Sequence, residues 1–185
     1  MTTTTPTEID APSWTIRLEH PVDIDQIHEL HRAAFRGPHE AELVDAVRSG
    51  AAFVPELSQV AVTDEGSVLG HVLISRIDLQ PYDEEQARLP VLALAPIAVL
   101  PQHAGRGIGS ALMRESLAMA DERDEPLVAV LGSPAFYGRF GFVPAAEYAV
   151  SGPYDEAADA FQVRRRPGAA IPPGTLVYSP AFGSV

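Results

Sequence analysis

The chain has 185 residues, a mass of 19.8 kDa and a formal net charge of −12, and 46% of its residues are hydrophobic. This length suits one domain with its own core, and the negative charge argues against binding to nucleic acid or to an anionic membrane surface. The absence of cysteine excludes disulfides, thiolate metal sites and a cysteine nucleophile. We expect no bound metal. We also expect a cytoplasmic location, since no secretory signal is visible and no apolar run reaches the ~20 residues that cross a bilayer.

The first half of the chain predicts helices between antiparallel strands. Residues 1–12 are expected to form a disordered leader, and residues 13–185 a single domain. Alternating apolar and polar side chains predict strands, and apolar side chains at three- and four-residue spacing predict helices. The predicted elements are a strand over 14–19, helices over 22–35 and 40–48, and strands over 59–63 and 68–79 joined by a hairpin turn.

The second half predicts a strand, a helix and a second strand in parallel connection. Residues 91–100 are nearly all apolar, as in a strand covered on both faces, and a helix over 107–123 leads to a strand over 127–131. A short helix is expected after Ser133, followed by short strands over 142–143, 161–165 and 175–178. The chain therefore predicts an α/β fold with a mixed central sheet of about six to seven strands and about four helices.

A glycine-rich turn, Gln102-His103-Ala104-Gly105-Arg106-Gly107-Ile108-Gly109, lies between the buried strand and the long helix. Free N–H groups at a helix N-terminus favour an anion, most often phosphate. A Walker A loop needs lysine, and all 13 lysine and arginine positions of this chain are arginine. A dinucleotide fingerprint needs a third glycine where Ser110 stands. The remaining interpretations are a pyrophosphate loop of the form Q/R-x-x-G-x-G/A and a tight turn in which glycines only relieve crowding.

A second motif accompanies this loop, Leu131-Gly132-Ser133-Pro134-Ala135-Phe136-Tyr137-Gly138-Arg139-Phe140-Gly141-Phe142. With both motifs in register, the chain from about Trp14 to Phe182 resembles the GCN5-related N-acetyltransferase (GNAT) superfamily, specifically a bacterial branch with an LGxPAxYGRFGF segment. The resemblance implies the GNAT fold, in which acetyl-CoA wedges between two parallel strands that splay apart. Here these strands are 91–100 and 127–131.

The resemblance also implies roles for individual residues. The pantetheine arm would pair with the strand that contains Pro96, and the pyrophosphate would bind the glycine-rich loop. We expect Pro96 to mark a bulge in that strand; the alternative is that it only bends the strand. Many members carry an asparagine where Val130 stands here, and Ser133 either replaces it or caps a helix. The implied cofactor-binding residues are Ile97, Ala98, Val99, Gln102, Ala104, Gly105, Arg106, Gly107, Ile108, Gly109, Ser110 and Ser133.

Tyr137 stands where the superfamily places its general acid, which would give a proton to the departing CoA thiolate. The alternative is an aromatic residue that only packs. The implied reaction is direct transfer of an acetyl group from acetyl-CoA to a primary amine of a small molecule or protein, through an oxyanion stabilised by N–H groups of strand 91–100.

The acceptor amine must lose a proton before it attacks, and the candidate bases are Glu40, Glu42, His71 and Asp78. The alternatives are that the carboxylates are only solvated and that His71 is a packed, structural residue. The resemblance places acceptor specificity in residues 35–42 and in the tail strands. Two alternatives remain: a noncatalytic protein that binds CoA or another ligand, and an acyltransferase that uses another acyl-CoA. No nucleic-acid or membrane partner is expected, and a homodimer stays open.

Overall fold

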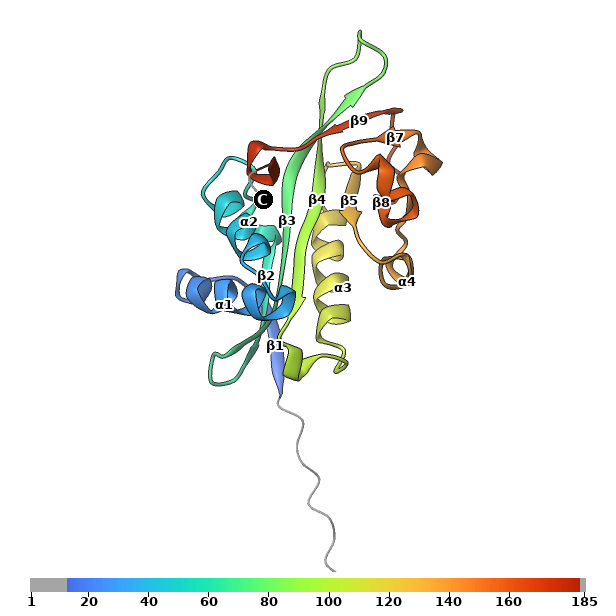
Figure 1. Ribbon diagram of the computed structural model, residues 1–185. Helices are drawn as coiled ribbons and strands as arrows, with labels where there is room; N and C mark the ends of the chain where they lie inside the picture. Colours follow the sequence, from blue (N-terminus) through green and yellow to red (C-terminus); the bar gives the residue numbers. More distant parts are fainter. Residues whose placement is uncertain (1–12, 184–185) are drawn as a thin grey trace, which may run out of the picture.

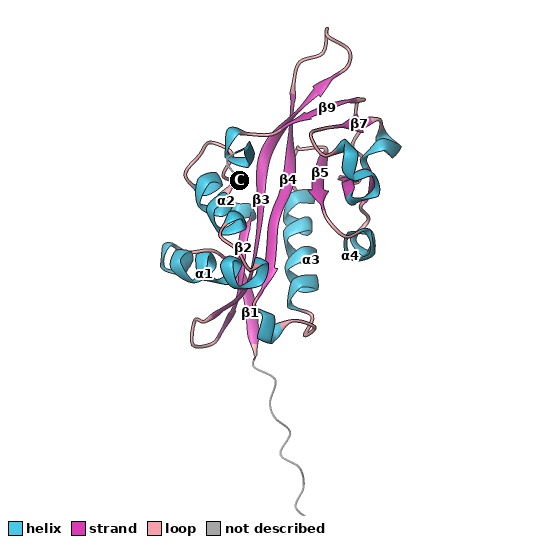
Figure 2. Ribbon diagram, in the orientation of Figure 1, coloured by secondary structure: helices cyan, strands magenta, loops and turns pink. Residues whose placement is uncertain are grey.

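The structure, a computed structural model, describes residues 13–183, and its central element is a mixed sheet of nine strands (Figures 1 and 2). The expected leader over residues 1–12 lies outside the described residues. The strands are β1 (Trp14–Leu18), β2 (Ser58–Thr63), β3 (Val68–Pro81), β4 (Leu89–Val99), β5 (Leu127–Leu131), β6 (Val143–Pro144), β7 (Val150–Ser151), β8 (Phe161–Arg165) and β9 (Gly174–Val177). The α-helices are α1 (Ile24–Phe35), α2 (His39–Arg48), α3 (Ile108–Asp121) and α4 (Pro134–Tyr137).

The sheet has the order β1-β2-β3-β4-β5-β8-β6, and β9 pairs with the outer end of β3 and with β7. Along the main path only β4 and β5 run parallel, connected by α3. The predicted mixed α/β fold, antiparallel at its start and parallel in its middle, is therefore confirmed. The strand count exceeds the expected number partly because β7 has only two residues, too few to show an alternating pattern.

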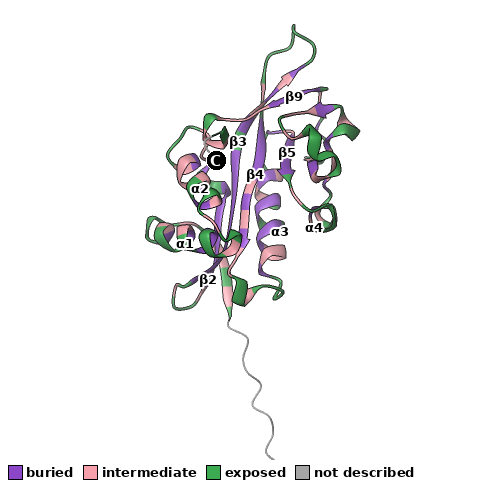
Figure 3. Ribbon diagram, viewed as in Figure 1, coloured by how far each residue is buried: buried purple, intermediate pink, exposed green. Residues whose placement is uncertain are grey.

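Helices cover both faces of the sheet centre. Along β2, Ala61 packs in the cluster that contains α3, whereas Val60 and Val62 pack with α1 and α2. Burial on both faces explains the continuous apolar runs of β4 and β5, which Figure 3 shows as buried. None of the helices in the described part of the chain is long and apolar enough to cross a membrane.

Two irregularities of β4 open the middle of the sheet. Val72 of β3 pairs with Ile97 of β4, and Ile74 pairs with Leu94. Between these two pairs β3 advances by two residues and β4 by three, so β4 contains one extra residue. The predicted bulge at Pro96 is therefore present. The pairing of β4 with β5 runs from Leu92 to Leu94 and ends there, opposite Val130. From residue 95 to residue 99, the edge of β4 that faces β5 has no strand partner among the described residues.

Candidate active site

A cleft of about 970 Å³ lies along the open part of β4. Figure 1 shows β4 between α1 and α2 on one side and α3 and α4 on the other. The lining comes from both sides and from the tail of the chain. It comprises Phe35, Glu40, Leu43, residues 93–99, 103–105, 107–110 and 129–133, Phe136, Tyr137, Arg139, Tyr154, Tyr178 and Phe182.

The glycine-rich loop forms one wall of this cleft. Gly105 and Gly107 have φ angles of 75° and 85°, and a Cβ at either position would meet no atom within 4 Å. Glycine is needed there for backbone conformation rather than for space. Gly107 is the N-cap of α3, and the N–H groups of Ile108, Gly109 and Ser110 in the first turn have no intrahelical acceptor. These groups can hold an anion, which fits the phosphates of a CoA molecule.

Two of the predicted loop residues lie outside the lining. Gln102 and Arg106 are exposed, and neither is among the residues that face the cleft, whereas Ala104 lines it. His103, to which the sequence assigned no role, does line the cleft, and its Nδ1 is buried without a hydrogen-bond partner. A buried polar atom without a partner is uncommon, and no other residue in 13–183 hydrogen-bonds this nitrogen.

The predicted pantetheine strand also faces the cleft. Ile97, Ala98 and Val99 line it along the unpaired edge of β4. Unpaired backbone groups on a strand edge need hydrogen-bond partners, and an extended ligand can supply them. The site thus offers an apolar trough with a polar edge that leads towards the first turn of α3.

Tyr137 packs at the point where β4 and β5 separate. Its side chain is 9% exposed, lines the cleft and contacts the rings of Phe136 and Phe142 edge-on. No group in residues 13–183 hydrogen-bonds the hydroxyl. Burial raises the pKa of Tyr137 to about 12, so the phenol keeps its proton at any physiological pH.

Ser133 occupies the N-cap position of α4, but its side chain makes no capping hydrogen bond. Instead its carbonyl oxygen accepts from the N–H groups of Phe136 and Tyr137, each at 3.0 Å. The hydroxyl is therefore left exposed in the lining of the cleft. The expected N-cap position of Ser133 is therefore confirmed, although its side chain makes no capping hydrogen bond, and contact of the hydroxyl with a ligand stays a prediction.

Among the four candidate bases, only Glu40 lines the cleft. Glu42 lies two residues further along α2, is exposed and does not face the cleft. Asp78 lies on β3 outside the lining and is 4.0 Å from Arg88.

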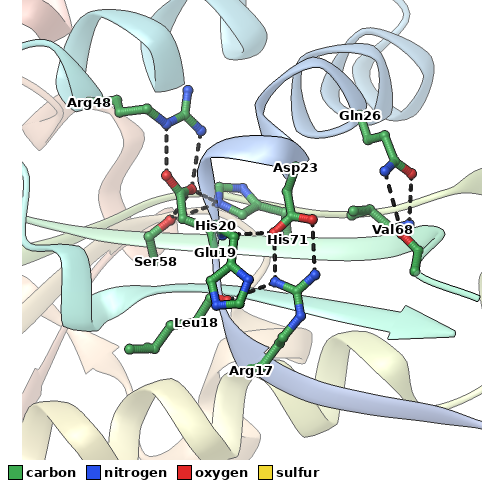
Figure 4. Close-up of polar contacts among 11 residues, drawn as sticks. Arg17, Leu18, Glu19, His20, Asp23, Gln26, Arg48, Ser58, Val68 and His71 are labelled. Carbon is green, nitrogen blue, oxygen red and sulfur yellow. Dashed lines mark hydrogen bonds and ion pairs between the residues drawn. The ribbon is translucent and has the colours of Figure 1, made fainter. Parts of the chain in front are cut away.

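His71 is fully buried in a polar network that joins α1, α2, β2, β3 and Glu19, the residue after β1; Figure 4 shows most of it. Ser58 Oγ donates to Glu19 Oε2 at 2.5 Å, because a carboxylate only accepts. His71 Nε2 therefore donates to Ser58 Oγ at 3.0 Å, and its Nδ1 accepts from His31 Nε2 at 2.8 Å. Arg48 donates to Glu19 from Nε at 2.8 Å. These bonds make His71 a structural residue rather than a base in the cleft.

The same network shifts the pKa values of its ionisable groups. Burial lowers the pKa of His31 to about 2 and also lowers that of His71, even though Glu19 opposes the second shift. Burial alone would raise the pKa of Glu19, but hydrogen bonds from His71, Arg48 and Ser58 outweigh it and hold the pKa below its usual range. Both histidines are therefore neutral beside a charged carboxylate at neutral pH.

For the part of the cleft away from the glycine-rich loop, the sequence predicted the segments that contribute but few individual residues. Residues 35–42 and the tail were expected to carry acceptor specificity, and both segments reach the cleft through Phe35, Glu40 and Tyr178. Tyr154 and Phe182 were not predicted. The tail reaches this place because β9 pairs with the outer end of β3, a long-range contact without a local sequence signal.

Comparisons with known proteins agree with this architecture. The family model of the acetyltransferase (GNAT) domain matches residues 15–145. The uncharacterized N-acetyltransferase YhbS of Escherichia coli K12 is 37% identical over 150 residues, which cover 81% of this chain and 86% of YhbS. The uncharacterized N-acetyltransferase YjhQ of the same organism is 32% identical over 133 residues, covering 72% of this chain and 71% of YjhQ.

Two solved structures are similar over nearly the whole chain. The crystal structure of YhbS from Escherichia coli in complex with CoA has a TM-score of 0.80 and 32% identity, covering 98% of this chain and 96% of that one. The structure of a GNAT family acetyltransferase from Brucella melitensis in complex with acetyl-CoA has a TM-score of 0.74 and 32% identity, covering 93% of this chain and 99% of that one.

Proposed function

The chain belongs to the GNAT family of N-acetyltransferases, and we propose that it transfers the acetyl group of acetyl-CoA to a primary amine of a small molecule or a protein. One observation carries the proposal: the open edge of β4, the first turn of α3 and Tyr137 all line a single cleft. The two similar structures that contain CoA or acetyl-CoA support the choice of cosubstrate.

Acetyl-CoA would bind along the wall formed by β4 and α3. Its pantetheine arm would pair with the backbone of Ile97, Ala98 and Val99, and the Ser133 hydroxyl would contact the arm from the opposite side. The pyrophosphate would accept hydrogen bonds from N–H groups in residues 105–110, where the α3 dipole favours negative charge. Ala104 would contribute from the cleft wall, and Gln102 and Arg106 from the outside of the loop, Arg106 through its positive charge.

The reaction forms an amide bond and breaks the thioester: the nitrogen loses a proton as the amide forms, and CoA leaves as a thiolate that takes up a proton from water. The attack places negative charge on the carbonyl oxygen, which backbone N–H groups of β4 would stabilise. Tyr137 would donate a hydrogen bond to the departing sulfur. Because its pKa of about 12 lies well above that of a thiol, full proton transfer to the thiolate is uphill, and stabilisation of the sulfur by the hydrogen bond is its main contribution.

An amine attacks only in its neutral form, so its proton must leave the cleft. Glu40 is the candidate base that reaches the lining, and the proton would pass to its carboxylate or to water beside it.

Binding and turnover can be tested separately. Calorimetry should show that acetyl-CoA and CoA bind and that NAD does not; binding of NAD alone would overturn the proposal. Thiol release from acetyl-CoA across a panel of primary amines should then depend on the amine. Tight binding of acetyl-CoA without release for any amine or peptide would instead support a noncatalytic binder, and faster release from a longer acyl-CoA would identify a different acyl donor.

A further inference from the structure

The part of the cleft away from the glycine-rich loop has an unusual lining. Its rings are Phe35, Tyr154, Tyr178 and Phe182, which we call the aromatic wall. Tyr154 meets Tyr178 edge-on with ring centroids 5.4 Å apart, and Tyr178 meets Phe182 at 5.0 Å. Phe35 is 42% exposed and stacks on His31 with ring centroids 6.0 Å apart.

Phe182 connects the aromatic wall to α2 by packing against two apolar clusters. Phe182 packs with Leu43 against the apolar cluster under α1 and α2, and with Tyr154 and Tyr178 against the cluster at the other end of the sheet. Figure 1 shows the last described turn, Pro180–Gly183, beside α2. The tail thus brings the aromatic wall to the helix that carries Glu40.

The lining of the cleft contains few charged side chains. Glu40 is the sole carboxylate among the described residues that line the cleft, and Arg139 is the sole arginine. The Arg139 guanidinium lies 4.8 Å from the Phe136 ring centroid, and its Nε donates to the Phe136 carbonyl oxygen, so it belongs to the α4 side near Tyr137. A carboxylate beside aromatic faces attracts an organic cation, because ring faces carry partial negative charge.

A peptide acceptor would need partners for its backbone N–H and C=O groups. The aromatic wall with Leu43 offers almost none besides the tyrosine hydroxyls. We propose that the acceptor is a compact primary amine, cationic at neutral pH, on an apolar aryl or alkyl body and without a carboxylate, with its ammonium group held by Glu40 and its body against the aromatic wall. This inference rests on the acetyltransferase function proposed above and specifies its acceptor.

The first test measures binding without turnover. Phenethyltrimethylammonium cannot lose a proton or accept an acetyl group, so its binding to the CoA-loaded protein reports recognition alone. It should bind at least about tenfold more tightly than phenethyl alcohol, a neutral analogue, which corresponds to ~1.4 kcal/mol. Equal binding of the two compounds, or binding of neither while CoA binds, would overturn the inference and leave the proposed function standing.

The matched variants are Glu40→Gln and Glu42→Gln, which remove the same charge from the same helix. Glu40→Gln should weaken phenethyltrimethylammonium by about tenfold, whereas Glu42→Gln should not, and both should bind CoA like the parent protein. Phe35→Leu keeps the apolar contact but removes the ring face, so it should weaken the ammonium compound more than the alcohol. Equal effects of the two glutamate variants would contradict a specific role for Glu40.

The second test is turnover. The value of kcat/KM should be at least about tenfold higher for phenethylamine than for phenylalanine, which adds only a carboxylate, or for ethanolamine, which lacks the apolar body. A preference for phenylalanine, ethanolamine or a peptide N-terminus would overturn the inference. The proposed function would stand in that case, because acetyl transfer itself would be established. Loss of all CoA binding would overturn the proposed function and the inference together.

Discussion

Gly132 and Tyr137 pack so closely that a Cβ on Gly132 would lie 2.5 Å from Cε2 of the Tyr137 ring. The backbone of Gly132 cannot easily move away, because its N–H donates to the Ala160 carbonyl and its own carbonyl accepts from Gln162 Nε2 at 3.0 Å. The position of the tyrosine hydroxyl in the cleft therefore depends on a glycine five residues earlier in the chain.

Gly132→Ala should push the Tyr137 ring out of place. We expect kcat to fall by about tenfold or more, because a misplacement near 1 Å is costly in a reacting geometry, while the affinity for CoA stays nearly unchanged. Gly138→Ala is the control, since a Cβ at Gly138 would meet no atom within 4 Å and its φ is −56°. Steady-state kinetics and CoA calorimetry on both variants test this. Similar rates for the two variants would show that Gly132 does not position the tyrosine.

Gly107→Ala should weaken CoA binding. The residue has a φ of 85° at the N-cap of α3, where a side chain is strained by ~1–2 kcal/mol, so the turn would relax and redirect its N–H groups. Gly66→Ala is a matched control, because Gly66 has a φ of 86° in a hairpin turn outside the cleft, also with open space around its Cβ. Both variants should lose similar thermal stability, but only Gly107→Ala should raise the dissociation constant for CoA. Equal CoA affinity in the two would argue against a phosphate site at this loop.

The stability of the fold should decrease as the pH falls below about 6.5. The pKa values of His31 and His71 are lower in the folded state than in the unfolded state. As the pH falls, the unfolded state therefore binds protons that the folded state does not bind, and the free energy of unfolding decreases. Each histidine contributes a slope of up to ~1.4 kcal/mol per pH unit in that range. The depressed pKa of Glu19 adds a loss only when the pH falls below ~4.5, the ordinary range of an unfolded glutamate.

Urea unfolding at pH 7.5, 6.5 and 5.5 measures this slope. His31→Leu should make it shallower by about one proton, whatever its effect on the stability at pH 7.5. His39→Gln, which alters an exposed histidine, should leave the slope unchanged. A free energy of unfolding that does not change between pH 7.5 and 5.5 would show that the buried histidines are not held neutral.

The sequence allowed much of the CoA side of the cleft to be predicted, because the signals there are local. Gly105 and Gly107 define a turn at a helix start, and Pro96 marks a bulge within one strand; each depends on backbone chemistry that neighbouring residues determine. Both features lie where they were expected. Their contacts with CoA remain proposals.

The acceptor side could not be predicted in the same way. Phe182 follows β9, which pairs with β3 about a hundred residues earlier, and Tyr154 lies between β7, which pairs with β9, and β8, which pairs with β5. His71 shows the opposite difficulty: its sequence position allowed a base, but its partners Glu19, Ser58 and His31 come from three other segments and make it part of the packed interior.

Acetyl transfer in this cleft is tested most directly by amine-dependent release of thiol from acetyl-CoA, compared between the parent protein and Tyr137→Phe. We predict release that requires the amine, and a kcat about 100-fold lower in the variant with an unchanged dissociation constant for acetyl-CoA, because only the hydrogen bond to the sulfur is lost. Equal kcat values would remove Tyr137 from the reaction. Bound acetyl-CoA that is never cleaved in the presence of any amine would contradict the proposed function itself.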